Sequence, residues 1–460
     1  MIRLFNAYFP TRTILLTVTE ALLVTLSFVV AVVLWKGTTF DATIYLLDLN
    51  GLWCILLVVA VFVVLMYYFD LYDSFVLSNR REVVTRLVGV LGSAFVALAV
   101  LYYAFPEDLR LGGKSLWVGV GIVAVAVPAW RWLFFALNRS ARFSERAIIY
   151  GGGPLATALM QEVTNRSELG VKIVGFVGEN TPMVPGIPLF EGDLDDLVER
   201  QGVQRVVVTM GDRRGKLPVE ELLKLKARGV YIQDGPDYYE SVTGKIPLDS
   251  LRLSWLLFSP GFHVRTVLQL YKRLFSLVLG TLALIVSLPI MLLAAIVIRL
   301  DSPGPVIFRQ KRMGEHGKLF NIFKFRSMYD GADKQQLTPA EHSDLRVTRV
   351  GKWLRRTRID ELPQLFNIVK GDMAFVGPRP FVPEQEMECA EKIPFYKERW
   401  LVKPGATGWA QINRGYNVTL EDNREKLAYD LFYIKNVSFG LDLYIMFATI
   451  KILVLGRGGR

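Results

Sequence analysis

The chain has 460 residues, of which 52% are hydrophobic and 21% are charged. Its 54 lysines and arginines and 43 aspartates and glutamates give a formal net charge of +11, which predicts anionic partners. This composition excludes disordered and collagen-like chains. The two cysteines allow no disulfide framework and place the soluble parts in a reducing cytoplasm, and the three scattered histidines disfavour a zinc site. The length predicts about three structural units.

Four apolar runs within residues 1–145 predict a four-helix transmembrane bundle. Each run has about 20 residues, enough to cross a bilayer core of roughly 30 Å. Buried core helices of a soluble protein are the alternative, but four successive runs of this length are rare in soluble folds. Arginines flank the runs on alternate sides, which predicts that both ends of the bundle face the cytoplasm. The expected spans are 13–35, 52–69, 87–105 and 116–137.

Three residues of these runs need separate interpretation. Glu20 interrupts the first run, and an intramembrane carboxylate can be functional. The other runs contain nothing that would serve as a transport relay, so we interpret Glu20 as a packing residue. Pro128 predicts a kink in the fourth helix because it removes a backbone donor. Arg131 is counted among the cytoplasmic flanking charges.

Short apolar strands at 147–150, 172–177 and 205–209 alternate with helical stretches, which predicts a Rossmann-like parallel α/β domain over 146–245. The glycines at 151–153 could place amides against a phosphate, and Glu179 could hold a ribose. However, Ala156 replaces the third glycine of the fingerprint and Pro154 removes an amide. We therefore prefer a structural or regulatory module to a catalytic NAD site.

A linker at 246–269 leads into a predicted catalytic domain at 270–460, which opens with an apolar run at 275–298. Basic residues lie at both ends of this run, so both ends prefer the cytoplasmic face. Ser287 and Pro289 lie near its middle, where proline removes a donor and the serine hydroxyl can satisfy a freed carbonyl. The pattern predicts a re-entrant membrane helix over 270–300, with a fifth spanning helix as the alternative.

Asp360 and Glu361 are adjacent carboxylates in a region rich in arginine and lysine, without a suitable histidine or cysteine nearby. Carboxylates ligate Mg²⁺, arginines pair with phosphate oxygens, and a carboxylate can attack phosphorus. Neighbours on a helix point about 100° apart, so the two carboxylates can have different tasks. An isolated Asp-Glu pair would more often form ion pairs on a solvated face. The preceding basic stretch, 349–356, predicts a helix at a lipid headgroup surface.

Several motifs, in this order along the chain, resemble the bacterial sugar transferase family, the monotopic polyprenyl-phosphate hexose-1-phosphate transferases. The resemblance covers 270–460, and the predicted bundle and Rossmann-like insert extend it to the large form of the family. Trp409 departs from the family pattern, where smaller aliphatic residues are common, and this leaves the sugar preference open. The matching stretches are SPGP at 302–305, KFRSM at 324–328, RRTRIDELPQLFN at 355–367, GDM at 371–373, GPRP at 377–380, KPGATGWAQ at 403–411 and YD at 429–430.

The resemblance implies a phosphoglycosyl transferase with a mainly helical, monotopic catalytic domain. Members of the family transfer a hexose-1-phosphate from a UDP-sugar to undecaprenyl phosphate and release UMP. The reaction passes through a covalent aspartyl phospho-sugar intermediate and starts exopolysaccharide, capsule or O-antigen synthesis. Glucose, galactose and N-acetylated sugars all stay open as the transferred group, and resemblance to the large members favours galactose or glucose. The family also implies a location in the bacterial inner (cytoplasmic) membrane, soluble domains facing the cytoplasm, and a homodimer.

The resemblance also assigns roles to particular residues. Asp360 would be the nucleophile and Glu361 its partner, with both at the Mg²⁺ site. Arg379 would bind the donor phosphate within its motif. Pro378 and Pro380, beside Arg379, would also belong to the substrate-binding site. Lys324 and Arg326 are weaker candidates for anion binding, and Ser287 and Pro289 would be the helix-breaking pair.

Two other functions stay open from the sequence. One is a membrane-anchored, NAD-dependent nucleotide-sugar dehydratase or reductase that works through the central domain. The other is a non-catalytic scaffold for polysaccharide assembly. Nucleic-acid binding is disfavoured, because the basic residues lie at membrane flanks and within the phosphate motifs.

Overall fold

The computed structural model describes residues 1–48, 50–73, 76, 80–105, 113–138, 144–178, 187–190, 194–211, 217–251, 255, 259, 261–262, 266–331, 346–414 and 419–454. Glu179, the predicted ribose partner, lies outside these residues. The chain forms two compact units. The first comprises Met1–Ile2 and Phe9–Gly235, and the second comprises Arg3–Tyr8 and Pro236–Arg460.

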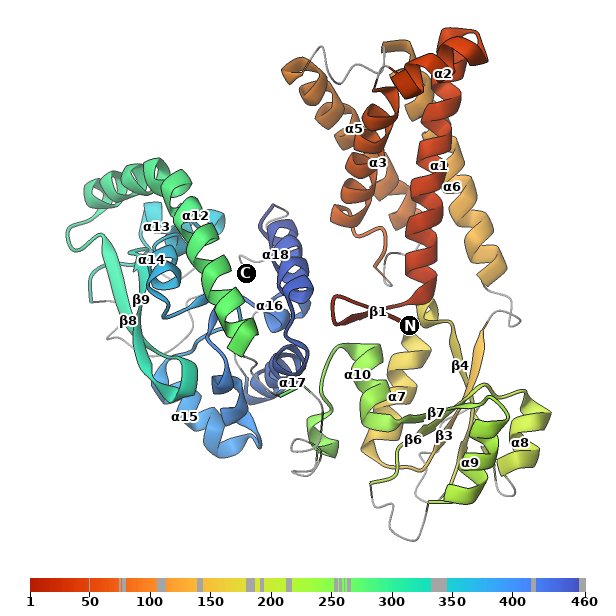
Figure 1. The fold of residues 1–460 in the computed structure, drawn as a ribbon. Helices are drawn as coiled ribbons and strands as arrows, with labels where there is room; N and C mark the ends of the chain where they lie inside the picture. The colour runs from red at the N-terminus through yellow and green to blue at the C-terminus, as the bar shows by residue number, and fades with distance from the viewer. Residues whose placement is uncertain are drawn as a thin grey trace. The chain divides into compact units, whose positions relative to one another are not determined.

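Four long helices open the first unit, and each is long enough and apolar enough to cross a membrane. They coincide with the four predicted apolar runs. Figure 1 draws them in red to orange, with a short helix, α2, that the sequence analysis does not predict. Pro128 lies inside α6, which continues through it. The bounds are α1 Thr11–Lys36, α2 Thr39–Asp48, α3 Gly51–Tyr68, α5 Arg80–Ala104 and α6 Gly113–Asn138.

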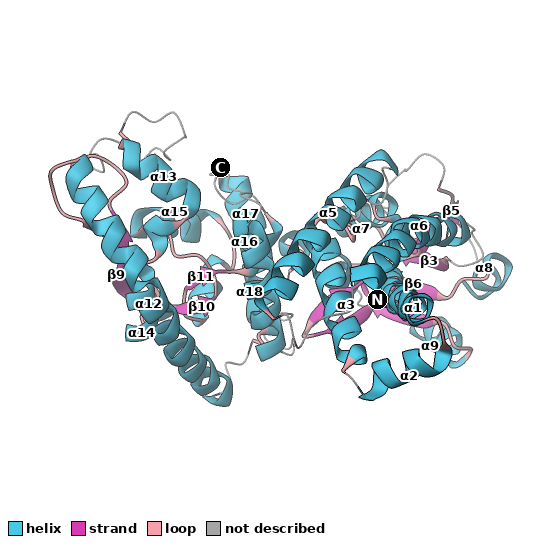
Figure 2. Cartoon of the chain, turned by 90° about the horizontal axis from the view of Figure 1, so that it is seen from above, coloured by secondary structure: helices cyan, strands magenta, loops and turns pink. Residues whose placement is uncertain are grey.

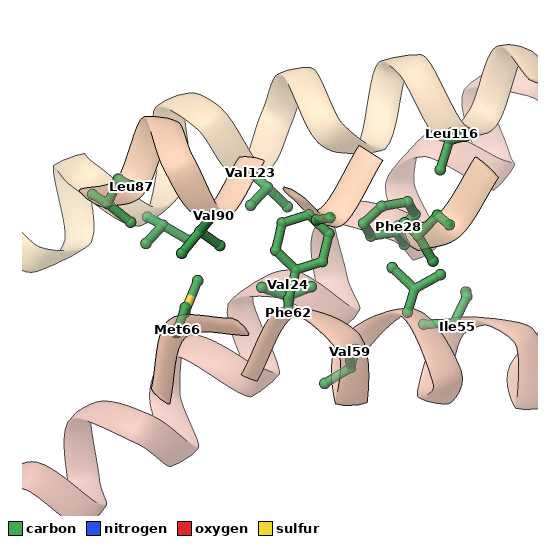
Figure 3. Close-up of a cluster of buried hydrophobic side chains, with 14 of the residues drawn as sticks. Val24, Phe28, Ile55, Val59, Phe62, Met66, Leu87, Val90, Leu116 and Val123 are labelled. Atoms are coloured by element: carbon green, nitrogen blue, oxygen red, sulfur yellow. The ribbon is translucent and has the colours of Figure 1, made fainter. Parts of the chain in front are cut away.

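An apolar core joins these four helices. Phe28 of α1 and Phe62 of α3 are fully buried, and their ring centroids lie 6.2 Å apart. Figure 3 shows these rings surrounded by Val24, Ile55 and aliphatic side chains of α5 and α6. Gly119 allows α6 to approach α1 closely, because a Cβ at this position would lie 2.6 Å from the Phe28 ring.

A buried ion pair lies within this apolar bundle. Glu20 of α1 is 0% exposed, and both of its oxygens accept from Arg131 of α6, at 2.5 and 2.9 Å. The Tyr72 hydroxyl donates to Glu20 at 3.0 Å, and Arg131 also donates to the Leu71 carbonyl. These contacts support the packing role predicted for Glu20. They correct the reading of Arg131 as a flanking charge, because its guanidinium is buried and paired.

A five-stranded parallel sheet completes the first unit, which confirms the predicted parallel α/β sheet. The strand order is β5-β4-β3-β6-β7, so the direction of strand addition reverses at β3. At the end of β3, Gly151 has a φ of +97° and no room for a side chain beside Met210. The bounds are β3 Glu145–Tyr150, α7 Pro154–Asn165, β4 Val171–Val177, β5 Leu189–Phe190, α8 Leu194–Gln201, β6 Arg205–Val208, α9 Val219–Ala227 and β7 Tyr231–Asp234.

The second unit contains the fifth apolar helix, α12 (Thr266–Asp301), with Pro289 in its interior. The α12 ribbon changes direction part-way along its length (Figure 1). The Ser287 hydroxyl donates to the Leu284 carbonyl at 3.2 Å, one residue before the carbonyl that Pro289 leaves without its helical donor. Many aliphatic side chains of α12 are exposed, as a membrane-facing helix requires.

Three of the remaining elements, α13, α14 and β10, pack against α12. The hairpin β8–β9 is antiparallel, and the short strands β10 and β11 pair in parallel. Figure 2 shows β10 and β11 between α12 and α18. The bounds are α10 Gly235–Thr243, β8 Ile307–Met313, β9 Leu319–Phe325, α13 Arg349–Thr357, α14 Gln364–Lys370, β10 Ala374–Val376, α15 Pro383–Lys392, β11 Gly405–Thr407, α16 Trp409–Asn413, α17 Leu420–Asn436 and α18 Phe439–Val454.

Residues Arg3–Tyr8, close to the start of the chain, belong to this second unit. Two short strands, β1 (Ile2–Leu4) and β2 (Ala7–Phe9), pair with each other. Arg3 donates to the Asn436 side chain at 2.7 Å, and Ser438 donates to the Phe5 carbonyl at 3.2 Å. Gly440 has no room for a Cβ, because the Phe5 side chain lies against it. Residues 3–8 therefore cover the junction between α17 and α18.

Candidate active site

The two predicted catalytic carboxylates lie on a 3₁₀ turn, Ile359–Glu361, directly after α13. Thr348 caps the start of α13 by accepting from the Gly351 amide at 2.9 Å. Arg358 ends the helix in a left-handed conformation, with a φ of +59°. Few residues other than glycine adopt this conformation, and such positions gather at functional sites. The reversal at Arg358 starts the turn that carries Asp360 and Glu361.

Asp360 is a buried carboxyl group with 8% of its surface exposed. Among the described residues its Oδ1 atom has no hydrogen-bond partner. Burial first, and then the charge of Glu361, raises the pKa of Asp360 to about 6, although Lys324 and Arg358 oppose the shift. At neutral pH the group is thus mostly ionised, with a poorly solvated oxygen.

Glu361 has the opposite environment. Its Oε1 atom lies 3.0 Å from the Lys324 ammonium, 3.0 Å from the Arg379 guanidinium and 3.7 Å from Arg358. Burial alone would raise the pKa of Glu361, but these cations outweigh it and hold the pKa well below the usual range. Adjacent carboxylates with pKa values pushed apart are typical of acid, base or nucleophile assignments in active sites.

Lys324 and Arg326 were predicted together as anion-binding candidates, and the structure separates them. Lys324 lies near the end of β9 and reaches Glu361. Arg326 is 6% exposed and donates to the carbonyls of Ser302 and Pro303, at 2.6 and 2.9 Å. These contacts support the turn that follows α12. These contacts give Arg326 a role in that turn, and none of them involves Asp360 or Glu361, so anion binding by Arg326 stays a prediction.

Arg379 lies on the loop that joins β10 to α15, between the two predicted prolines. The Pro378 carbonyl accepts from the Gly405 amide at 3.0 Å, and the Pro380 carbonyl accepts from Arg312 at 3.3 Å. The rings of both prolines also fix φ, which limits the motion of the loop. The structure therefore gives these prolines a role in shaping the loop, and it brings Arg379 to Glu361.

A buried network behind this loop was not predicted from the sequence. Arg399 donates to the Arg379 carbonyl at 3.0 Å and pairs with Glu386 and Asp430, each at 2.9 Å. The three charged side chains are at most 4% exposed. Asp430 lies in one of the stretches that match the family, but the sequence assigned it no role. Arg399 and Glu386 lie in no recognisable motif, and their partners are distant in the sequence.

Three other residues that the sequence singled out, Ser287, Pro289 and Trp409, have no contact with the two carboxylates among the described residues. Ser287 and Pro289 are in the interior of α12, where they shape the helix. Trp409 is 8% exposed, stacks on Phe432 with centroids 5.3 Å apart, and donates to the Gly244 carbonyl at 2.8 Å. Its contacts are those of a packing residue.

The carboxylate pair was also tested as a magnesium site. Among the described residues no group of three or more His, Cys, Asp or Glu side chains could hold a metal. Mg²⁺ often binds through only one or two carboxylates together with substrate phosphates and waters. The unpartnered Oδ1 of Asp360 fits this mode, as does Glu361, whose three cation contacts all involve Oε1. The residues present are therefore compatible with Mg²⁺.

Comparisons with known proteins found a matching family model and several similar relatives. The model of the family described as "Bacterial sugar transferase" matches residues 267–456. The chain is 42% identical over 228 residues to the UDP-N-acetylgalactosamine-undecaprenyl-phosphate N-acetylgalactosaminephosphotransferase of Aeromonas hydrophila. That match covers 48% of this chain and about half, 52%, of the relative.

Two relatives match over longer stretches. The undecaprenyl-phosphate glucose phosphotransferase of Komagataeibacter xylinus is 34% identical, over 78% of this chain and 68% of that protein. The UDP-glucose:undecaprenyl-phosphate glucose-1-phosphate transferase of Xanthomonas campestris pv. campestris is 31% identical, over 85% of this chain and 84% of that protein. The similarity thus extends well beyond the carboxylate-bearing part of the chain.

Proposed function

The chain belongs to the bacterial sugar transferase family and is an enzyme, and from this premise we propose that it is a phosphoglycosyl transferase. Its substrates are a UDP-hexose and undecaprenyl phosphate. It transfers hexose-1-phosphate to the lipid and releases UMP, the first step of an exopolysaccharide, capsule or O-antigen. The names of the relatives support the substrate class.

The observation that carries this proposal is the contrast between Asp360 and Glu361. In the first step an Asp360 oxygen attacks the sugar-linked phosphorus, and the anhydride bond to UMP breaks. In the second step an oxygen of undecaprenyl phosphate attacks the same phosphorus and releases the Asp360 carboxylate. One anhydride replaces another, so neither step needs ATP. The buried, unpartnered Oδ1 atom suits a nucleophile because solvation does not stabilise its lone pairs.

The cations around Glu361 are suited to the donor diphosphate. Lys324 and Arg379 lie at 3.0 Å from this carboxylate, so a diphosphate entering beside it would meet both. Pro378 and Pro380 keep the Arg379 loop in shape. When bound by Asp360 and Glu361, Mg²⁺ would supply charge neutralisation at the phosphates.

We further propose that the protein is anchored in the bacterial inner membrane with both soluble parts in the cytoplasm. The four apolar helices form a transmembrane bundle, residues 146–245 form a Rossmann-like structural or regulatory domain, and α12 enters and leaves on one face. Basic residues at both ends of α12 and Pro289 in its interior support the re-entrant path. Labelling of single cysteines placed at 300–320 from the periplasmic side would contradict it.

The function is tested with the purified full-length protein in nanodiscs. UDP-glucose, UDP-galactose and UDP-N-acetylgalactosamine are offered with and without undecaprenyl phosphate and MgCl₂, and UMP is measured. We expect multiple turnovers with one of the donors only when the lipid is present, and at most one UMP per enzyme without it. UMP release at the same rate with and without undecaprenyl phosphate would contradict the proposal, as would an NAD-dependent conversion of the UDP-sugar. Mass photometry of the same sample tests the expected homodimer.

A further inference from the structure

Three cationic side chains donate to backbone carbonyls at the end of β10 and in the loop that follows it and carries Arg379. Lys272 of α12 donates to the Val376 carbonyl at 3.0 Å, and Arg399 donates to the Arg379 carbonyl at 3.0 Å. Arg312 of β8 donates to the Pro380 carbonyl at 3.3 Å. The loop is therefore fixed from three elements that are far apart in the sequence.

The charges of these three cations are compensated differently. Lys272 forms an ion pair with Asp442 at 3.2 Å, and Arg399 is paired with Glu386 and Asp430. Arg312, in contrast, forms no ion pair with a carboxylate in the described part of the chain. Its other side-chain contact is the Gln310 amide oxygen at 2.6 Å, and its buried Nε atom has no hydrogen-bond partner among the described residues.

A partly buried guanidinium without a carboxylate partner lowers the stability of a fold, because its desolvation is not offset by an ion pair. Holding one carbonyl does not require this arrangement, since Lys272 and Arg399 do the same while paired. Strongly perturbed charges of this kind gather where a ligand of opposite charge binds. Arg312 therefore has the environment of a residue that completes its pairing with a bound anion.

The position of Arg312 identifies the anion. Its charge interacts with those of Arg379, Glu386 and Glu361, and burial first, then Arg379, lowers the pKa of Arg312 to about 10, while the two carboxylates oppose the shift. Lys324, Arg358 and Arg379 already surround Glu361. Arg312 contacts Pro380, next to Arg379, and adds a fourth cation to this region, where the nearby carboxylate Glu386 is already paired with Arg399. This excess of positive charge is complementary to a diphosphate, which a guanidinium fork binds in a bidentate manner.

We propose that Arg312 is a further donor-binding residue whose guanidinium pairs with the diphosphate of the nucleotide-sugar, beside Arg379. This inference rests on the proposed function. It assigns a binding role to a strand residue outside the carboxylate turn and outside the Arg379 loop. In the bound state the diphosphate would supply the acceptors that Arg312 lacks within the fold.

Three variants distinguish the charge of Arg312, the two-pronged shape of its guanidinium, and any general effect of replacing an arginine on β8. R312M removes the charge and keeps the aliphatic stem, whereas R312K keeps the charge and loses the fork. The matched control is R309M, because Arg309 lies on the same strand, is exposed, and has its guanidinium over the Phe323 ring. All are prepared as full-length protein in nanodiscs, and thermal melting establishes that each is folded.

The first measurement is the dissociation constant of UDP, used alone as the probe, and the second is the KM of each substrate. For R312M we expect UDP affinity to fall and donor KM to rise at least tenfold, as for a lost charge-assisted pair. The KM for undecaprenyl phosphate should change less than twofold. R312K should show a smaller loss of UDP affinity, and R309M should match the wild type.

The inference is overturned if R312M binds UDP as tightly as the wild type, even if kcat falls, because Arg312 would then only position the Pro380 carbonyl. Equal increases in both KM values, or absence of UDP binding by the wild type, would also overturn it. If R312M does not fold, the test rests on R312K. Unchanged UDP affinity in R312K would contradict bidentate binding of the diphosphate by the Arg312 guanidinium. Failure of the proposed function has a different signature, in which UDP binds and depends on Arg312 but no donor gives UMP.

Discussion

Glu20 and Glu361 show two ways in which this chain places a glutamate in a poorly solvated environment. Glu20, in the apolar bundle, faces one cation, and Arg131 contacts both of its oxygens. Glu361 has three cations within 4 Å of a single oxygen. The first arrangement is electrically complete inside the fold. The second concentrates more positive charge than one carboxylate balances, which is useful only if another anion arrives.

The largest expected effect is that of D360N on turnover. A carboxamide does not form the acyl phosphate, so UMP release should fall at least 1000-fold, about 4 kcal/mol in the activation barrier. Radiolabelled UDP-sugar tests the same point, because wild type should retain sugar phosphate at position 360 and D360N should not. Substantial turnover by a folded D360N variant would remove Asp360 as the nucleophile.

E361Q tests the cation cluster and should have the next largest effect. The amide keeps the shape of the side chain but removes the negative charge that pairs with Lys324, Arg358 and Arg379. Because these cations would no longer be held in place, we expect a roughly 100-fold loss of turnover. The magnesium concentration for half-maximal rate should rise in the same titration. A magnesium dependence identical to that of the wild type would exclude Glu361 as a metal partner.

D360N should also stabilise the fold at neutral pH. The pKa of Asp360 is raised to about 6 in the folded protein, above the value of about 4 for an unfolded chain. Its contribution to stability is therefore present below pH 4 and lost as pH rises through 6, at a cost of roughly 3 kcal/mol. In EDTA the melting temperature of D360N should exceed that of wild type at pH 7.5, with the difference shrinking at pH 4. A lower melting temperature at pH 7.5 would mean that burial does not disfavour this carboxylate.

The pH dependence of the rate gives an independent check. Because the nucleophile must be ionised, kcat/KM should fall about tenfold per pH unit below 6, about 1.4 kcal/mol per unit, and level off above 7. The profile is measured at subsaturating donor. A rate that stays constant from pH 7 down to 5 would place the pKa of the essential carboxyl group much lower.

The smallest effect is expected in the bundle. E20Q keeps a hydrogen-bond acceptor for Arg131 but leaves the guanidinium uncompensated, so stability in detergent should fall by about 1 kcal/mol. The rate of the folded protein should be unchanged, in contrast to E361Q. A selective loss of turnover in E20Q, at unchanged melting temperature, would give Glu20 a functional role and remove the contrast between the two glutamates.

The sequence predicted much of the fold because the strongest signals were long and local. The four apolar runs, the apolar helix with Pro289 and the strands at 147–150 and 172–177 correspond to observed elements. Short elements such as α2 and β5 were missed, since a few residues give too weak a periodicity. Arg131 was misread for a different reason, because its buried partner lies 111 residues earlier in the chain.

For the candidate site, the sequence indicated which residues come together but not which charged side chains pair with one another. Asp360, Glu361, Lys324 and Arg379 meet in the structure, as the motifs suggested. Arg326, two positions after Lys324, is instead bound to backbone carbonyls. Burial and the pairing of side chains depend on tertiary contacts, so neither the unpartnered Oδ1 of Asp360 nor the pairing of Arg399 could be read from spacing.

The packing of residues 3–8 on the second unit matters for anyone who shortens this protein. A truncated chain that starts at Pro236 keeps every residue of the carboxylate cluster but exposes Asn436, Ser438 and the surface of Gly440 that Phe5 covers. Low solubility or low activity of such a fragment would then reflect the loss of residues 3–8 and would not test the chemistry of the carboxylate cluster. Supplying the first nine residues through a flexible tether should restore solubility.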